Sequence, residues 1–179
     1  MSVVEYVQPY FQIKGFLPSL ALAFTWSAFM FRFRVGMWSL ALLAFPGTAA
    51  HEFAHFIVGL ILWAKPQHFT VWPRRSGNSW IFGSVSFRGI NLLNAAFVAM
   101  APLLLLPLAW LCLIHITTMF WISDRLGWWF FSGYLTASFL FGCIPSSQDF
   151  KVGGSSLMLY GTVGASYMLC AFTWASWHH

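Results

Sequence analysis

Long apolar runs separated by short polar segments dominate the pattern of residues along this chain. A bilayer core of about 30 Å is crossed by about 20 apolar residues in a helix, because each residue adds about 1.5 Å. No internal repeat or low-complexity linker separates the runs, so we expect one membrane-embedded domain over residues 1–179. Five runs come close to the required length and predict transmembrane helices over about residues 15–31, 35–63, 91–116, 126–144 and 155–174.

The longest polar stretch, residues 65–89, lies between the second and third predicted helices. Its segments 69–72 and 80–87 are rich in β-forming residues, and Pro73 with the run Ser76-Gly77-Asn78 separates them. This arrangement predicts a β-hairpin over about residues 69–87. The expected fold is therefore an all-α polytopic membrane protein with a short β-hairpin at the membrane surface after its second helix.

The composition excludes disorder and nearly every water-soluble fold. Hydrophobic residues make up 59% of the chain and charged residues only 7%, against about a quarter charged in soluble domains. The net charge of +5 is spread over the whole length, so it predicts no nucleic-acid partner. The positive-inside rule favours a cytoplasmic N-terminus and hairpin. Six cations fall on that side and three on the other: Lys14, Lys65, Arg74, Arg75, Arg88 and Lys151 against Arg32, Arg34 and Arg125.

Chemistry-bearing residues concentrate on the second predicted helix, in the run His51-Glu52-Phe53-Ala54-His55. The i, i+4 spacing of this H-E-x-x-H run puts both imidazoles on one helical face, where they can share a metal ion. Glu52 then lies within reach of a metal-bound water. The alternative is a pair of packing histidines hydrogen-bonded to Glu52 without a metal, which is an expensive way to pack an apolar helix. Ionisable groups at this depth favour a functional site.

A catalytic zinc site needs three protein ligands and an open position for water. The residues that could supply the third ligand are His68, His115, Asp124 and Asp149. On the predicted topology His115 and Asp124 fall on the opposite side of the membrane. His68 begins the hairpin on the correct side, where a loop histidine is more often solvated. Asp149 follows the fourth helix on that side, and a re-entrant, non-helical segment around Pro145 would bring it to the histidines.

This arrangement resembles the site-2 proteases, a family of intramembrane zinc metalloproteases. The resemblance rests on H-E-x-x-H in a transmembrane helix, the β-prone segment after it, Ala101-Pro102 in the next helix, and Asp149 in a Pro-containing loop after a further helix. The H-E-x-x-H run is the sharp match. Three positions depart from the family pattern. Ala101 precedes Pro102 where the family has Gly, Gly142 stands where the family has Asn, and Phe150 follows Asp149 where the family has Gly.

The resemblance implies that His51, His55 and Asp149 bind one zinc ion per chain and that Glu52 is the general base. It implies hydrolysis of a peptide bond in or near a transmembrane segment of a membrane protein. The charge distribution, and not the resemblance, places the site on the cytoplasmic side. The expected partners are this substrate and the lipid bilayer. The scarce polar surface is compatible with a regulatory membrane subunit, and the small-residue run over 161–164 is compatible with a homodimer. Two other functions stay open: a catalytically inactive, protease-like binding or scaffold subunit, and a metal-ion transporter. Only two carboxylates, Glu52 and Asp149, fall in or near the membrane, which counts against transport.

Overall fold

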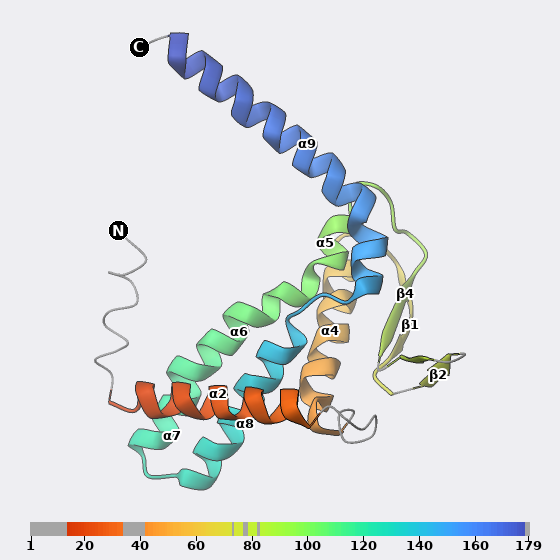
Figure 1. Cartoon of the computed structure of the whole chain (residues 1–179). Coiled ribbons are helices and arrows are strands. Elements are labelled where there is room, and N and C mark those ends of the chain that lie inside the picture. Colours follow the sequence, from red (N-terminus) through yellow and green to blue (C-terminus); the bar gives the residue numbers. More distant parts are fainter. Residues whose placement is uncertain (1–13, 34–41, 73, 77–78, 82, 178–179) are drawn as a thin grey trace.

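The computed structural model describes residues 14–33, 42–72, 74–76, 79–81 and 83–177. Residues 35–41 of the second predicted helix lie outside these ranges. Over the described residues the fold is mostly helical, as expected (Figure 1). The α-helices are α2 (Phe16–Arg32), α4 (Phe45–Ile61), α5 (Ala95–Ala99), α6 (Leu105–Leu111), α7 (Thr118–Ile122), α8 (Leu126–Gly142) and α9 (Ser147–Trp177).

Four short strands follow α4 and form the predicted hairpin in two parts. β1 pairs antiparallel with β4, with Phe69 opposite Val85, and β2 pairs antiparallel with β3 further out. The hairpin is thus confirmed, although it begins at Pro66, and residues 77–78 of its expected turn lie outside the described part of the chain. The strands are β1 (Pro66–Thr70), β2 (Arg74–Ser76), β3 (Ser79–Ile81) and β4 (Ser84–Phe87).

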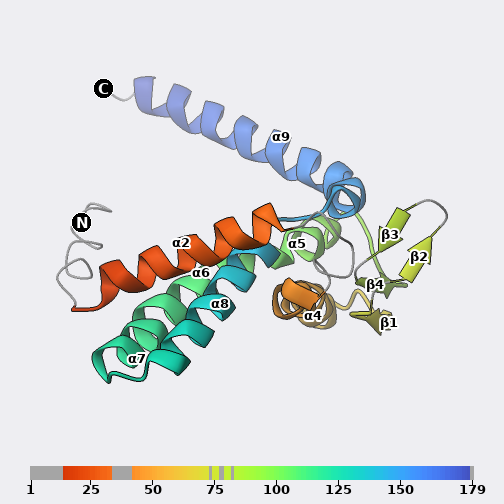
Figure 2. The same cartoon turned by 60° about the horizontal axis from the view of Figure 1, so that its bottom comes forward.

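The chain reverses direction after α4. β1 and β4 then run back alongside this helix (Figures 1 and 2). Near the end of α4, a Cβ added to Gly59 would lie 2.2 Å from the ring of Phe87. Near its start, the rings of Phe45 and Trp72 are 6.2 Å apart. The hairpin therefore accompanies α4 over most of its length.

Prolines explain where two helical segments begin. α4 begins at Phe45 with Pro46 in its first turn, where the missing N–H costs no hydrogen bond. The third predicted helix is interrupted after α5, and the helical path resumes at Ala101 with Pro102. The 3₁₀ segment η1 (Ala101–Leu104) and the π-helical segment η2 (Cys112–Thr117) join α5, α6 and α7 into this path.

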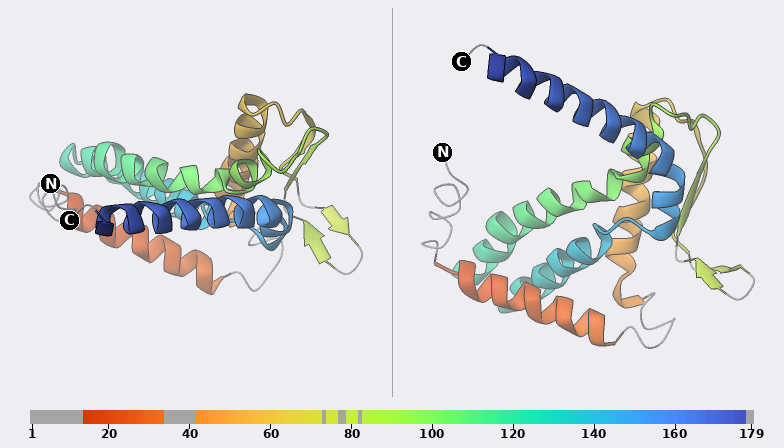
Figure 3. Two further views of the ribbon diagram at one scale, coloured as in Figure 1. Left: turned by 90° about the horizontal axis from the view of Figure 1, so that it is seen from above. Right: turned by 45° about the horizontal axis from the view of Figure 1, so that its top comes forward.

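The last helix begins eight residues before the predicted start at 155. α9 runs from Ser147 to Trp177 and bends in its first third (Figures 1 and 3). The sequence Gly153-Gly154-Ser155-Ser156 lies in that third, and Gly/Ser pairs are a common cause of helix bends. Beyond the bend α9 leaves the other helices and projects away from them (Figure 3).

Two helical stretches are long and apolar enough to cross a membrane, among the residues that the structure describes. They are Ala101–Ile122, with a mean hydropathy of 2.1, and Ser147–Ala175, with a mean hydropathy of 1.2. α2, α4 and α8 are shorter, with 17 residues each. α8 lies in the middle of the helices and contacts α2, α4 and α6 (Figure 2).

Candidate metal centre

Three of the residues singled out in the sequence meet at one point. Nε2 of His51 and Nε2 of His55 are 3.1 Å apart. The carboxylate of Asp149 lies against both rings, with Oδ2 3.4 Å from Nε2 of His51 and Oδ1 3.1 Å from Nε2 of His55. One ligand atom from each residue can thus face a common centre, and the group could hold a metal ion.

The other ring nitrogen of each histidine points to a backbone carbonyl. Nδ1 of His51 is 2.8 Å from the oxygen of Gly142, and Nδ1 of His55 is 2.7 Å from the oxygen of Val98. A carbonyl only accepts hydrogen bonds, so each Nδ1 carries a proton and donates it. Each neutral ring therefore presents the lone pair of its Nε2 to the centre. Metal-binding histidines are typically oriented in this way.

The spacing of the three donor groups fits zinc. Atoms bound tetrahedrally at about 2.0–2.1 Å lie about 3.3 Å from one another. The Nε2 atoms of His51 and His55, 3.1 Å apart, are close to that value, and each lies at a similar distance from a different oxygen of Asp149, at 3.4 and 3.1 Å. Two lone pairs and a carboxylate at such distances repel one another unless a cation or a shared proton lies among them. The donor set of two imidazoles and one carboxylate is one that catalytic zinc sites use.

Glu52 lies beside this cluster on the same helix. Its side chain is buried, with 8% of its surface exposed. It lines a pocket of about 800 Å³ together with all three members of the cluster. The walls of this pocket come from four other places: β4 with the preceding Gly83, α5, the end of α8, and the start of α9. A molecule in the pocket would therefore contact the general-base candidate and the candidate metal ligands at once.

A close helix–helix contact holds the carbonyl that orients His51. A Cβ added to Gly47 on α4 would lie 2.1 Å from the backbone oxygen of Ser138 on α8. A Cβ added to Gly142 would lie 2.4 Å from the backbone oxygen of Gly47. Only residues without a Cβ fit at such distances. The two glycines thus let the end of α8 approach α4 closely enough for the carbonyl of Gly142 to reach His51.

The backbone around Pro145 is non-helical, as expected, and Asp149 reaches the histidines from the first turn of α9, which begins directly after it. Ser146 precedes the helix and forms a reciprocal capping box with Asp149. The Ser146 N–H donates to Oδ2 of Asp149 at 2.6 Å, and the Asp149 N–H donates to Oγ of Ser146 at 3.2 Å. The carboxylate is therefore held by its own helix terminus. The pattern Ser-x-x-Asp over 146–149 was the available sequence signal for this arrangement.

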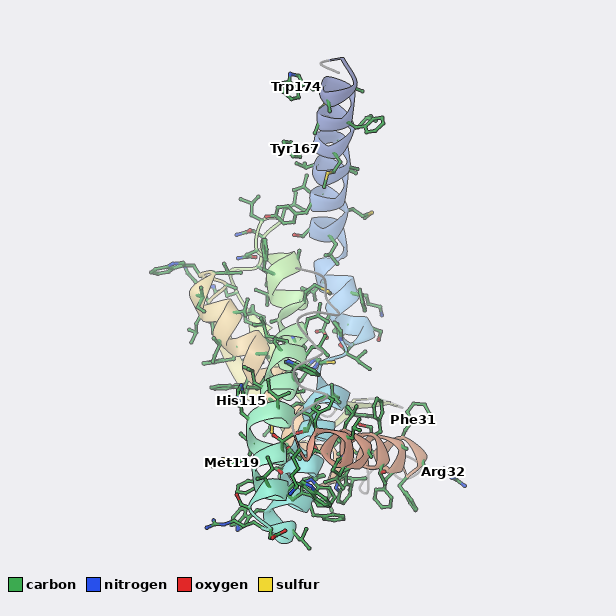
Figure 4. All side chains as sticks on the ribbon, turned by 90° about the vertical axis from the view of Figure 1, so that its left-hand side faces the viewer. Phe31, Arg32, His115, Met119, Tyr167 and Trp174 are labelled. Carbon is green, nitrogen blue, oxygen red and sulfur yellow. The ribbon has the colours of Figure 1, made fainter. Side chains whose placement is uncertain are left out.

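The other candidates for a third ligand lie elsewhere. His68 is exposed on β1, and Asp124 is exposed in the turn between α7 and α8 with a φ of 52°. His115 is exposed in the π-helical segment, on the same outer side as Met119 (Figure 4). Among the described residues, the group of His51, His55 and Asp149 is the one cluster with metal-binding spacing.

No protein-family model matches the chain, and no match was found among the curated proteins or the solved structures.

Proposed function

We propose that this protein is an intramembrane zinc metalloprotease of the site-2 protease type. The observation that carries the proposal is the convergence of His51, His55 and Asp149, with Glu52 lining the same pocket. The H-E-x-x-H run places Glu52 and both histidines on one helix, and the capping box brings in Asp149. Three protein ligands leave a fourth position for water, as in catalytic zinc sites.

The membrane assignment is part of this proposal. We place five helical segments in the bilayer, with the N-terminus and the site side in the cytoplasm. At about 1.5 Å per residue, the 17-residue helices α2, α4 and α8 are about 25 Å long, the shorter end of what crosses a bilayer. Each carries large apolar side chains that are mostly exposed, such as Phe24 (66%), Phe53 (53%) and Trp128 (58%). Lipid is the environment in which such surfaces are stable.

Glu52 performs the proton transfers in the proposed reaction. When bound, zinc lowers the pKa of a coordinated water towards neutrality and polarises the substrate carbonyl. Glu52 takes the proton of the attacking water and returns it to the leaving amine. His51 and His55 keep their Nδ1 protons on the carbonyls of Gly142 and Val98, which fixes their ring orientation during these steps.

The pocket favours an extended, apolar substrate segment. A helix hides its carbonyls in backbone hydrogen bonds, so the substrate must unwind before cleavage. β4 lines the pocket, and an extended segment that pairs with its edge would pass beside Glu52, a form of β-augmentation. Val98, Ile144 and Val152 also line the pocket and would contact apolar substrate side chains. These features favour unwound transmembrane segments as substrates.

The test combines metal content with proteolysis. Protein purified in detergent without chelator is analysed by mass spectrometry for zinc, and cleavage of fluorescein-labelled casein is followed by fluorescence. We expect about one zinc per chain in the wild type and in Glu52→Gln, and loss of zinc in His51→Ala. Glu52→Gln should lower cleavage by at least a hundredfold, because it removes the proton acceptor.

Each other outcome counts against the proposal in a specific way. Wild-type protein that neither contains nor takes up zinc would overturn the metal site. Cleavage that persists in Glu52→Gln would show that the activity comes from elsewhere. Zinc at one per chain without cleavage of casein or of a labelled single-pass membrane protein would overturn the protease assignment and favour an inactive, protease-like binding subunit.

A further inference from the structure

The hairpin approaches the side chain of Glu52 at Gly83. A Cβ added to Gly83 would lie 2.6 Å from Cγ, 2.7 Å from Oε1 and 2.9 Å from Cδ of Glu52. Ordinary contacts of a Cβ lie between 3.4 and 4 Å. The backbone at Gly83 does not have the positive φ that favours glycine, so an alanine there meets no backbone strain. Residue 83 therefore has no room for a side chain on the side that faces the Glu52 carboxylate.

The location of the hairpin does not depend on residue 83. β4 is held in place by its pairing with β1 and by the packing of the Phe87 ring against Gly59 of α4. The three atoms that a methyl group at residue 83 would meet are the outer atoms of Glu52, which is a flexible side chain. The carboxylate is thus the part that would move, by about 1 Å, while the fold stays in place.

We propose that Gly83 is a positioning residue for Glu52. Its missing side chain leaves the space in which the carboxylate lies beside His51 and His55, and the backbone of the hairpin closes that space from outside. This inference rests on the proposed function, because it assigns a task to Glu52. It gives the hairpin a second task besides pairing with substrate, namely to fix the general base.

The test is the variant Gly83→Ala, with Gly161→Ala as the matched control. Gly161 has nothing within 4 Å of an added Cβ, so the control makes the same change without a contact. Both variants should keep about one zinc per chain, since neither touches a ligand. A misplacement of about 1 Å at a reacting group can lower a rate about a hundredfold. We expect a loss of this size in kcat on labelled casein for Gly83→Ala, with little change in KM, and wild-type rates for Gly161→Ala.

A binding readout separates this inference from the protease assignment. Acetohydroxamate chelates the metal of the cobalt-substituted protein, and the visible absorption of cobalt reports its affinity. Its hydroxamate proton goes to Glu52, so displacement of that carboxylate should weaken binding at least tenfold in Gly83→Ala, as in Glu52→Ala. Equal affinity in Gly83→Ala and wild type would overturn the inference, even if no substrate is cleaved. Absence of cobalt binding in the wild type would overturn the proposed function, and this inference with it.

The double variant Glu52→Asp/Gly83→Ala tests whether a shorter side chain at position 52 removes the same steric contact. Aspartate is one methylene shorter, so its carboxylate leaves the space that the new methyl group needs. Adding Gly83→Ala to Glu52→Asp should lower the affinity for acetohydroxamate by less than a further threefold. A further loss of tenfold or more would show that residue 83 acts through the fold of the hairpin and would overturn the contact as the cause.

Discussion

The two parts of α9 belong to one continuous helix and have opposite surroundings. From Ser147 to Tyr160 the helix contacts the rest of the protein, whereas residues 161–175 are all exposed. In the first part polar groups bond to other segments. Oγ of Ser156 accepts from the N–H of Ala96 at 3.0 Å, and the hydroxyl of Tyr160 donates to the oxygen of Leu93 at 2.7 Å. Asp149 belongs to the same part.

In the second part hydroxyl groups bond back to their own helix. The hydroxyls of Thr162, Ser166 and Thr173 donate to carbonyls three or four residues earlier. Tyr167 and Trp174 stand out from the helix with 73% and 66% of their surface exposed (Figure 4). A helix whose polar groups are satisfied internally is what a lipid environment requires. The comparison assigns the candidate metal centre to the first part of α9, and under the proposed membrane assignment the second part lies in lipid.

The largest expected effect is the loss of the metal ligand in the first part. Asp149→Ala removes one of three donors and leaves two imidazoles that cannot hold zinc tightly. We expect zinc in the purified protein to fall from about one per chain to less than about a tenth. Asp124→Ala makes the same chemical change in an exposed turn and should keep its zinc. A zinc content of about one per chain in Asp149→Ala would show that α9 supplies no metal ligand.

A smaller effect is expected where the first part packs on α5. A Cβ added to Gly153 would lie 2.6 Å from Cβ of Ala99, whereas nothing lies within 4 Å of one added to Gly161. Gly153→Ala should push α9 away from α5 and destabilise the protein by about 1–3 kcal/mol, as overpacking does. Gly161→Ala should be neutral or slightly stabilising, because alanine favours a helix. Thermal unfolding in detergent measures both, and equal midpoints for the two variants would contradict the packing difference.

Local spacing predicted the part of the site that lies within one helix. His51 and His55 share a face of α4 because i and i+4 positions always do, and their proximity is confirmed. The proximity of Asp149 to them is also confirmed, as is the non-helical backbone around Pro145. The prediction missed only that Asp149 itself lies in the first turn of α9. The start of α9 could have been predicted, because Ser146-x-x-Asp149 has the pattern of a capping box.

Contacts between distant segments could not be predicted from local patterns. The ring of Phe87 packs against Gly59 and holds the hairpin along α4. The sequence around either residue does not indicate that the two are in contact. The carbonyls that orient the histidines come from Gly142 and Val98, and backbone groups leave no signature in side-chain identity. The sequence therefore predicted which side chains could bind a metal, and the structure adds what orients them.

The smallest expected effect concerns the capping box that joins the start of α9 to the site. Ser146→Ala removes the hydroxyl that accepts from the N–H of Asp149, but the Ser146 backbone N–H still donates to the carboxylate. Loss of an N-cap side chain costs about 1 kcal/mol. If all of that loss reaches the bound state, zinc affinity falls about fivefold, which competition with a zinc-binding dye can resolve. Ser166→Ala removes a hydroxyl in the second part of α9, where it bonds only to its own helix, and should leave the affinity unchanged. Equal losses in both variants would mean that the two parts of α9 are coupled, and the division between site and anchor would fail.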